Sequence, residues 1–129
     1  MDCPSDIVFV VDDSRRVGSS NFARMKSFLS RLVNGLDLDS GITRVGLLTY
    51  SSYARVRFYL SYYSSVSSVR SAISRLTYSG TSSTTNTAVA LAYVRKSMLA
   101  STRGDRSDSP NIVVVLTAGR SSSTSATQV

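Results

Sequence analysis

Asp12 and Ser14 are two side chains able to bind a ligand, and they follow directly after an apolar run. The run at residues 7–11 has the length of a buried strand, and a polar turn and an amphipathic segment come after it. Such a layout places the acid and the hydroxyl at the carboxyl end of a strand, where open α/β sheets bind ligands. The pattern predicts a ligand site there. A strand end that caps the next helix is the competing interpretation.

The composition argues against catalysis. The chain has 129 residues and no histidine, which excludes imidazole bases and imidazole metal ligands. It contains no phosphate-binding loop, no metal-binding cysteine pattern and no nucleophile beside a general base, so we expect no enzyme. We also expect no membrane segment, because no apolar run is long enough to span a bilayer.

Apolar periodicity predicts strands that alternate with helices. Strands are expected at residues 6–11, 44–50, 54–60 and 111–117, and helices from 19 or 20 to 36, at 66–76 and at 86–99. This alternation predicts an α/β fold, a Rossmann-like doubly wound and mostly parallel sheet with helices on both faces.

The order of the strands can also be predicted. Right-handed crossovers place the first strand in the centre and the last strand beside it. The short link at residues 51–53 predicts a hairpin, which makes the third strand an antiparallel edge. Alternation along that strand predicts that Arg55 and Arg57 point outward, and that Val56 and Phe58 point inward.

Four segments, in order, resemble the von Willebrand factor A (vWA) domain family. They are the Asp-x-Ser opening at Asp12, the second strand at 43–50, the loop and helix start at 84–91, and the stretch at 113–120. The resemblance is to the extracellular-matrix type found in collagen VI, matrilins, cochlin and molluscan matrix proteins. It implies that residues 1–120 are the N-terminal two-thirds of the family fold, without its last two strands. Residues 121–129, rich in Ser and Thr, are expected to be a disordered tail.

In that family the opening loop belongs to an adhesion site for a divalent cation with oxygen ligands. The resemblance carries three ligands over to Asp12, Ser14 and Thr85. Arg16 stands in place of a serine ligand, and Ala118 stands in place of a distal aspartate. Because magnesium requires a nearly octahedral set of oxygens, we expect a degenerate site that binds Mg²⁺ weakly or not at all.

Arg16 would also repel a bound cation. Its guanidinium could pair with Asp12 or Asp13 and so replace the cation from within. The alternative is a residual metal site that Asp13 or water completes.

The resemblance implies a non-catalytic protein-binding or adhesion module of a secreted extracellular matrix protein. A collagen-like fibre or another matrix protein is the expected partner, contacted through the face around Asp12, Asp13, Arg16 and Thr85. A second candidate surface contains Arg55, Arg57 and Tyr59, because arginine and tyrosine are favoured at interfaces. Ordinary β-propensity also explains each of these residues taken singly.

Two smaller signals remain. Arg103, Gly104 and Asp105 resemble the tripeptide that integrins recognise, although three residues favour an ordinary charged turn. Cys3 is the only cysteine, so it is either a spare thiol or half of a disulfide whose partner lies outside this chain.

Two other functions stay open. The formal net charge of +7 favours a polyanion as partner, such as a glycosaminoglycan or an acidic matrix or mineral-associated polymer, with nucleic acid less favoured. Alternatively, an uncovered last strand would make the chain a structural half-domain that assembles with a second copy or a partner chain.

Overall fold

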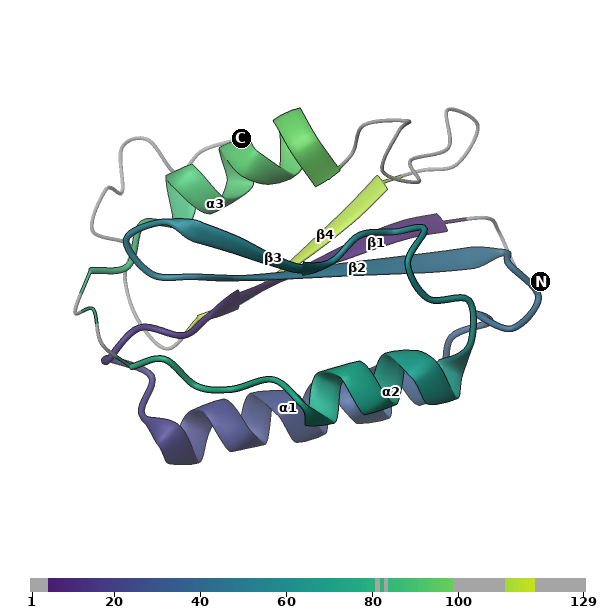
Figure 1. Cartoon of the computed structure of the whole chain (residues 1–129), viewed down its shortest axis with the longest axis horizontal. Coiled ribbons are helices and arrows are strands. Elements are labelled where there is room, and N and C mark those ends of the chain that lie inside the picture. Colours follow the sequence, from purple (N-terminus) through teal and green to yellow (C-terminus); the bar gives the residue numbers. More distant parts are fainter. Residues whose placement is uncertain (1–4, 81, 83, 99–110, 118–129) are drawn as a thin grey trace.

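The computed structural model describes residues 5–80, 82, 84–98 and 111–117. It contains a four-stranded sheet in the order β3-β2-β1-β4 (Figure 1). The strands are β1 (Ser5–Asp12), β2 (Thr43–Tyr50), β3 (Ala54–Phe58) and β4 (Asn111–Leu116). The helices are α1 (Ser19–Asn34), α2 (Val66–Ser74) and α3 (Thr87–Tyr93), and a π-helical segment, η1 (Val94–Met98), follows α3.

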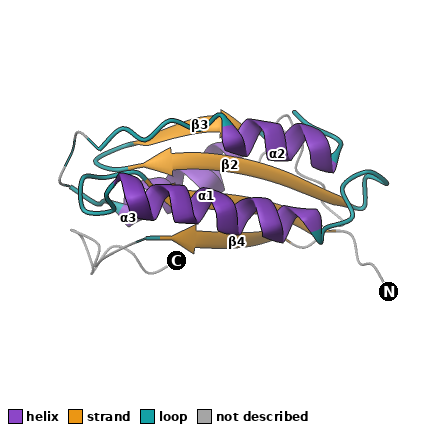
Figure 2. Ribbon diagram, turned by 90° about the horizontal axis from the view of Figure 1, so that it is seen from below, coloured by secondary structure: helices purple, strands orange, loops and turns teal. Residues whose placement is uncertain are grey.

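The sheet topology agrees with the predicted order. Strand β1 pairs in parallel with β2 and with β4, whereas β3 pairs antiparallel with β2. Helices α1 and α2 cover one face of the sheet and α3 covers the other (Figures 1 and 2). The doubly wound α/β fold is therefore confirmed. Among the described residues, no helix has the length and apolar character needed to cross a membrane.

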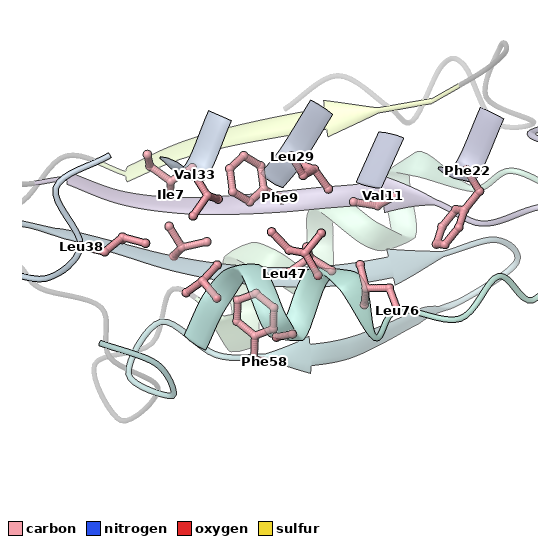
Figure 3. Close-up of a cluster of buried hydrophobic side chains, with 14 of the residues drawn as sticks. Ile7, Phe9, Val11, Phe22, Leu29, Val33, Leu38, Leu47, Phe58 and Leu76 are labelled. Carbon is pink, nitrogen blue, oxygen red and sulfur yellow. The ribbon is translucent and has the colours of Figure 1, made fainter. Parts of the chain in front are cut away.

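The core has two parts, one on each face of the sheet, because successive strand residues point to opposite faces. The larger part lies between the sheet and the α1/α2 layer (Figure 3), and includes Phe9, Leu29, Val33, Leu47 and Phe58. The smaller part, under α3, includes Val8, Val10, Leu48, Tyr50 and Ala90. Strand β1 contributes to both and is buried from Asp6 to Asp12.

Some large apolar side chains are exposed. Phe28 and Leu32 of α1 lie three or four residues from other apolar positions of that helix, a spacing typical of a buried face, yet they are 46% and 37% exposed. They turn away from α2, and Phe28 lines a shallow groove beside Leu116 at the end of β4. On β4, Ile112, Val113 and Val115 are also exposed.

A β-bulge changes the predicted pattern of β3. Leu47 pairs with Phe58 but Leu48 pairs with Val56, so Arg57 is the extra residue on β3. The bulge turns Phe58 toward the core under α1 and α2, whereas Val56 packs on the opposite side with α3. The prediction that Val56 and Phe58 share one face and that Arg57 points outward is therefore wrong. A bulge adds one residue and so breaks the two-residue alternation.

Helix α1 begins where the sequence predicts, but without a side-chain cap. Its N-cap is Gly18, with φ of 79°, and no side chain caps the helix. The sequence predicts a helix start at residue 19 or 20, and α1 begins at Ser19. The positive φ explains the glycine, because side chains with a Cβ rarely adopt this conformation.

Tyr78, in the segment between α2 and α3, fastens the loop between β1 and α1. Its hydroxyl donates a hydrogen bond to the Ser14 carbonyl (2.7 Å) and accepts one from the Gly18 N–H (3.0 Å). Its ring lies against Phe22 of α1, with ring centroids 5.2 Å apart. One side chain thus satisfies two backbone groups that no strand or helix pairs.

The backbone after Tyr78 holds the same loop. The Gly80 N–H donates to the Asp13 carbonyl (3.0 Å), and the Arg15 N–H donates to the Ser82 carbonyl (2.7 Å). Gly80 has φ of 60°, and a Cβ there would meet the Tyr78 ring at 2.5 Å. The loop that contains Asp13 and Ser14 is therefore held by hydrogen bonds from a distant segment.

Two leucines of α1 provide a matched test of the larger core. Leu29→Ala removes a fully buried side chain, so we expect the free energy of unfolding to fall by about 2–5 kcal/mol. Leu32→Ala makes the same change in the same helix at an exposed position, and the expected loss is below about 1 kcal/mol. Urea unfolding followed by circular dichroism measures both, and equal losses would contradict the described packing.

Tyr78→Phe tests whether the loop depends on this hydroxyl. The substitution keeps the ring but removes the acceptor of the Gly18 N–H and one of the two donors to the Ser14 carbonyl, which still accepts from the Val17 N–H. We expect the unfolding free energy to fall by about 1–2 kcal/mol, with faster amide hydrogen exchange at Gly18. Tyr62→Phe is the control, because Tyr62 is 68% exposed. A Tyr78 variant as stable as this control would refute the role of the hydroxyl.

Candidate functional site

Asp12, Ser14 and Thr85 meet at the carboxyl ends of β1 and β4. Both carboxylate oxygens of Asp12 accept hydrogen bonds, Oδ1 from the Ser14 N–H (2.8 Å) and Oδ2 from the Thr117 hydroxyl (2.8 Å). The hydroxyls of Ser14 and Thr85 hydrogen bond to each other at 3.1 Å. Asp12, Ser14 and Thr85 are all buried. The structure thus brings together the three residues that the sequence suggested, and adds Thr117.

The sheet register explains why Thr117 reaches Asp12. Val11 of β1 pairs with Leu116 of β4, so the residues that follow them, Asp12 and Thr117, also lie side by side. Sequence reasoning did not identify Thr117, although it directly precedes Ala118, the position given to a missing ligand. The sequence did contain a signal for Thr117, namely its position at the end of the predicted strand 111–117.

The loop that carries Thr85 is anchored to β2. The Asn86 N–H donates to the Ser51 carbonyl (2.8 Å), and the Asn86 side chain caps α3 by accepting from the Val89 N–H. The Tyr50 hydroxyl hydrogen bonds to Thr87 at 3.0 Å, and burial raises the pKa of Tyr50. The start of α3 is thereby held in register with the end of β2, which sets the position of Thr85.

The described residues at this site offer a cation two kinds of oxygen. Asp12 supplies one carboxylate, and Ser14, Thr85 and Thr117 supply neutral hydroxyls that are hydrogen bonded within the protein. Calcium takes roughly six to eight oxygen ligands, whereas magnesium prefers an octahedral set in which one or two carboxylates are joined by several waters. Within the part of the chain that the structure describes, no three His, Cys, Asp or Glu side chains are grouped to hold a metal ion.

Asp13 faces a different environment from Asp12. It is buried, and burial raises the pKa of its carboxyl group; Arg55 and Arg57 lower that pKa, whereas the neighbouring Asp12 raises it. The cations that act on Asp13 therefore come from β3. Arg16, expected to pair with Asp12 or Asp13, has an exposed side chain. Its pairing stays a prediction.

Of the two arginines that act on Asp13, Arg57 is half-buried and Arg55 is exposed. Its Nε donates to the Thr49 hydroxyl at 3.0 Å, and its buried Nη2 atom has no hydrogen-bond partner. Burial lowers the pKa of Arg57, Arg55 lowers it further, and Asp13 opposes both effects. A buried guanidinium nitrogen without a partner is uncommon in proteins, and it marks this position as unusual.

The predicted surface of Arg55, Arg57 and Tyr59 is not a single patch. Arg55 is exposed, whereas Arg57 turns inward to Thr49 on β2. Tyr59 is half-buried and packs with the core under α3, on the opposite side of the sheet from Phe58. The remaining predicted residues lie outside the described part of the chain, namely Cys3, Arg103, Gly104, Asp105 and Ala118. Residues 121–129 also lie outside it.

Comparisons with known proteins agree with the fold. Mouse matrilin-3 is 32% identical over 118 residues, which cover 91% of this chain and 24% of matrilin-3. The collagen alpha-4(VI) chain of Mus musculus is 40% identical over 121 residues, which cover 92% of this chain and 5% of that protein. The chain thus spans a quarter or less of these relatives.

Among solved structures, proximal thread matrix protein 1 from the mussel byssus superposes with a TM-score of 0.86 at 22% identity. The match covers 93% of this chain and 32% of the mussel protein. One structure of that protein has zinc in its metal-ion-dependent adhesion motif and superposes with a TM-score of 0.85. The family model for the von Willebrand factor type A domain matches residues 6–129, so this chain belongs to that family.

Proposed function

We propose that this chain is a non-catalytic binding module of an extracellular matrix protein, and that its divalent-cation site is degenerate. The carrying observation is the donor set, because among the described residues Asp12 supplies one carboxylate, whereas Ser14, Thr85 and Thr117 supply neutral hydroxyls. Each Asp12 oxygen keeps a lone pair beside its hydrogen bond, so a cation that bound there would gain one negative charge. Binding of a partner through a shared metal is correspondingly disfavoured.

The proposed partner is a matrix protein, and a collagen-like fibre is the first candidate. Matrilins and a collagen VI chain are the relatives that support an extracellular matrix setting. The contact surface would be the edge of the sheet where the β1–α1 loop and the start of α3 meet. The exposed side chains of Arg15 and Arg16 lie on that edge, so acidic groups of a partner would be favoured there.

Calorimetric titration with Mg²⁺ and Mn²⁺ tests the degenerate site. We expect dissociation constants weaker than about 1 mM, because one carboxylate and three hydroxyls are a poor set for a hard cation. Asp12→Asn is the control, since it removes the charge but retains an oxygen acceptor. Micromolar binding that this substitution abolishes would contradict the proposal.

Adhesion to immobilised collagen VI microfibrils tests the function itself. We expect binding that is equal, within a factor of about two, in Mg²⁺ and in EDTA, because a partner held by direct contacts needs no metal bridge. Arg16→Gln should weaken binding. Arg95→Gln is the control, because Arg95 is exposed on η1, which follows α3 on the other face of the sheet from α1. Adhesion that EDTA abolishes would refute the metal-independent mechanism.

A second candidate function is polyanion binding through the outer surface of α1 and α2. The two helices contain no acidic residue, and Arg24, Arg31 and Arg70 are exposed on them. Arg70 reaches across to Ser30 of α1 at 3.0 Å, which places its charge between the helices. The nearest acid in sequence to α2, Asp39, accepts a hydrogen bond from the Val66 N–H at the start of that helix. Fixed positive charge on one surface attracts sulfated or carboxylated polymers.

Heparin binding measured at increasing salt tests this second function. A charge-driven interaction should weaken steeply between 50 and 200 mM salt, about tenfold or more, because screening grows with ionic strength. The triple substitution of Arg24, Arg31 and Arg70 by Gln should reduce the affinity at least as much. Substitution of Arg55 and Arg95 by Gln is the control on other surfaces. Equal affinity in all variants would remove this surface from consideration.

A further inference from the structure

Helices α1 and α2 form a surface that carries positive charge and contains no acid of its own. The two helices lie side by side on one face of the sheet (Figure 2). Helix α1 contains Arg24, Lys26 and Arg31, α2 contains Arg70, and neither helix contains Asp or Glu. Fixed positive charges that no acid balances repel one another and attract anions from outside the protein. The surface is therefore suited to an anionic partner.

Hydrogen bonds between the two helices show how they are aligned. The Lys26 ammonium donates to the carbonyls of Ser74 and Leu76, both at 2.9 Å, at and just beyond the end of α2. Arg70 Nε donates to the Ser30 hydroxyl at 3.0 Å, about one turn further along α1. Because residue numbers rise along α1 while they fall along α2, the helices are antiparallel. Arg70 thus reaches the middle of α1.

Arg31 and Arg70 approach the same turn of α1 from two different helices. Arg31 directly follows Ser30 and lies three residues before Asn34, to which Arg70 Nη1 donates at 3.5 Å. Residues three apart are neighbours on a helix surface. Both arginines are exposed, and Arg31 forms no hydrogen bond or ion pair with another described residue. The Arg31 guanidinium and the remaining N–H groups of Arg70 are thus available to a ligand.

Asp39 limits this basic surface at one end. It lines a hollow with Arg70 at the start of α2, where its carboxylate accepts a hydrogen bond from the Val66 N–H. Asp39 and Arg70, both in the described part of the chain, form no ion pair with each other. Asp39 would repel an anion, so the favoured position for one is the side of Arg70 that faces Arg31.

The chemistry of the groove between the helices favours a sulfate group. The residues that line its hollow beside Lys26 offer hydroxyls, a cation and small apolar groups, but no aromatic ring: Ala23, Lys26, Ser27, Ser30, Ile73 and Ser74. Single-stranded nucleic acid is held by aromatic stacking, which this hollow does not offer. One guanidinium engages both oxygens of a carboxylate, whereas a sulfate ester has three terminal oxygens and can accept from two guanidinium groups.

We propose that the groove between α1 and α2 binds a sulfated glycan of the extracellular matrix, with one sulfate group held between Arg31 and Arg70. Arg24 precedes Arg31 by about 10 Å along the helix axis and contacts the next anionic group of the glycan. Lys26 holds α2 against α1 and is a positioning residue. The inference rests on the proposed polyanion function, and it identifies the ligand and the principal contact.

Arg31→Gln and Arg70→Gln are the central variants, measured by calorimetric titration with a heparin octasaccharide at about 150 mM salt. Each should lower the affinity about tenfold, because each removes charge-assisted hydrogen bonds to the bound sulfate. Arg75→Gln is the matched control, because Arg75 is an exposed arginine at the C-cap of α2, outside the pair. The expected loss for this control is below about threefold.

Two further variants separate a specific site from diffuse charge. Arg70→Lys retains the charge but loses the planar guanidinium, and should lower the affinity about threefold or more. The double variant Arg31→Gln with Arg70→Gln should lose less than the product of the two single losses, because both residues contact one sulfate. Arg31→Gln leaves the hydrogen bonds between the helices intact, so it remains informative if the Arg70 variants are less stable.

Hyaluronan, which carries carboxylates only, and a DNA duplex of matched charge are the comparison probes. Each should bind at least about tenfold more weakly than the heparin octasaccharide at the same salt. Equal affinity for either probe overturns the inference. Equal losses in the Arg31, Arg70 and Arg75 variants overturn it too, although heparin binding by the parent chain would still support the polyanion function. A parent chain that binds none of the three probes overturns that function and the inference with it.

Discussion

The burial of β1 between two parallel neighbours is the constraint on which the rest of the structure depends. Every residue from Asp6 to Asp12 is buried, and each face of the strand contributes to a different part of the core. A parallel sheet covered by helices on both faces requires such a strand. Because β1 ends with Asp12 and continues into Asp13, the same burial brings two acids into an environment where charge is costly.

The negative charges of Asp12 and Asp13 are compensated in different ways. Asp12 accepts hydrogen bonds from its own loop and from Thr117 at the end of β4. Asp13 is buried, which raises the pKa of its carboxyl group, and Arg55 and Arg57 of β3 lower that pKa. The loop that contains Asp13 and Ser14 is held by Tyr78 from a third region of the chain.

Membership of the von Willebrand factor type A domain family gives this arrangement a context. A mussel matrix protein of the same fold has zinc in its adhesion motif. In the present chain, Asp12, Ser14, Thr85 and Thr117 lie at the corresponding strand ends. The sheet and the helices are held together by the apolar core on both faces of the sheet.

Several features could be predicted from the sequence alone. Apolar periodicity predicted the strands, the helices and their α/β arrangement, and short links with right-handed crossovers predicted the order β3-β2-β1-β4. The grouping of Asp12, Ser14 and Thr85 followed from the family resemblance. These features follow from the spacing of apolar residues along the chain and from general rules of chain connection, and both can be read from the sequence.

Only the tertiary structure decided the rest. The bulge at Arg57, the exposure of Phe28 and Leu32, the glycine cap of α1 and the contact of Thr117 with Asp12 all depend on segments distant in sequence. The two-residue alternation of a strand cannot show where one extra residue will be inserted. Whether a carboxylate is balanced by a cation, a hydroxyl or a backbone N–H is likewise determined by which strand ends meet in space.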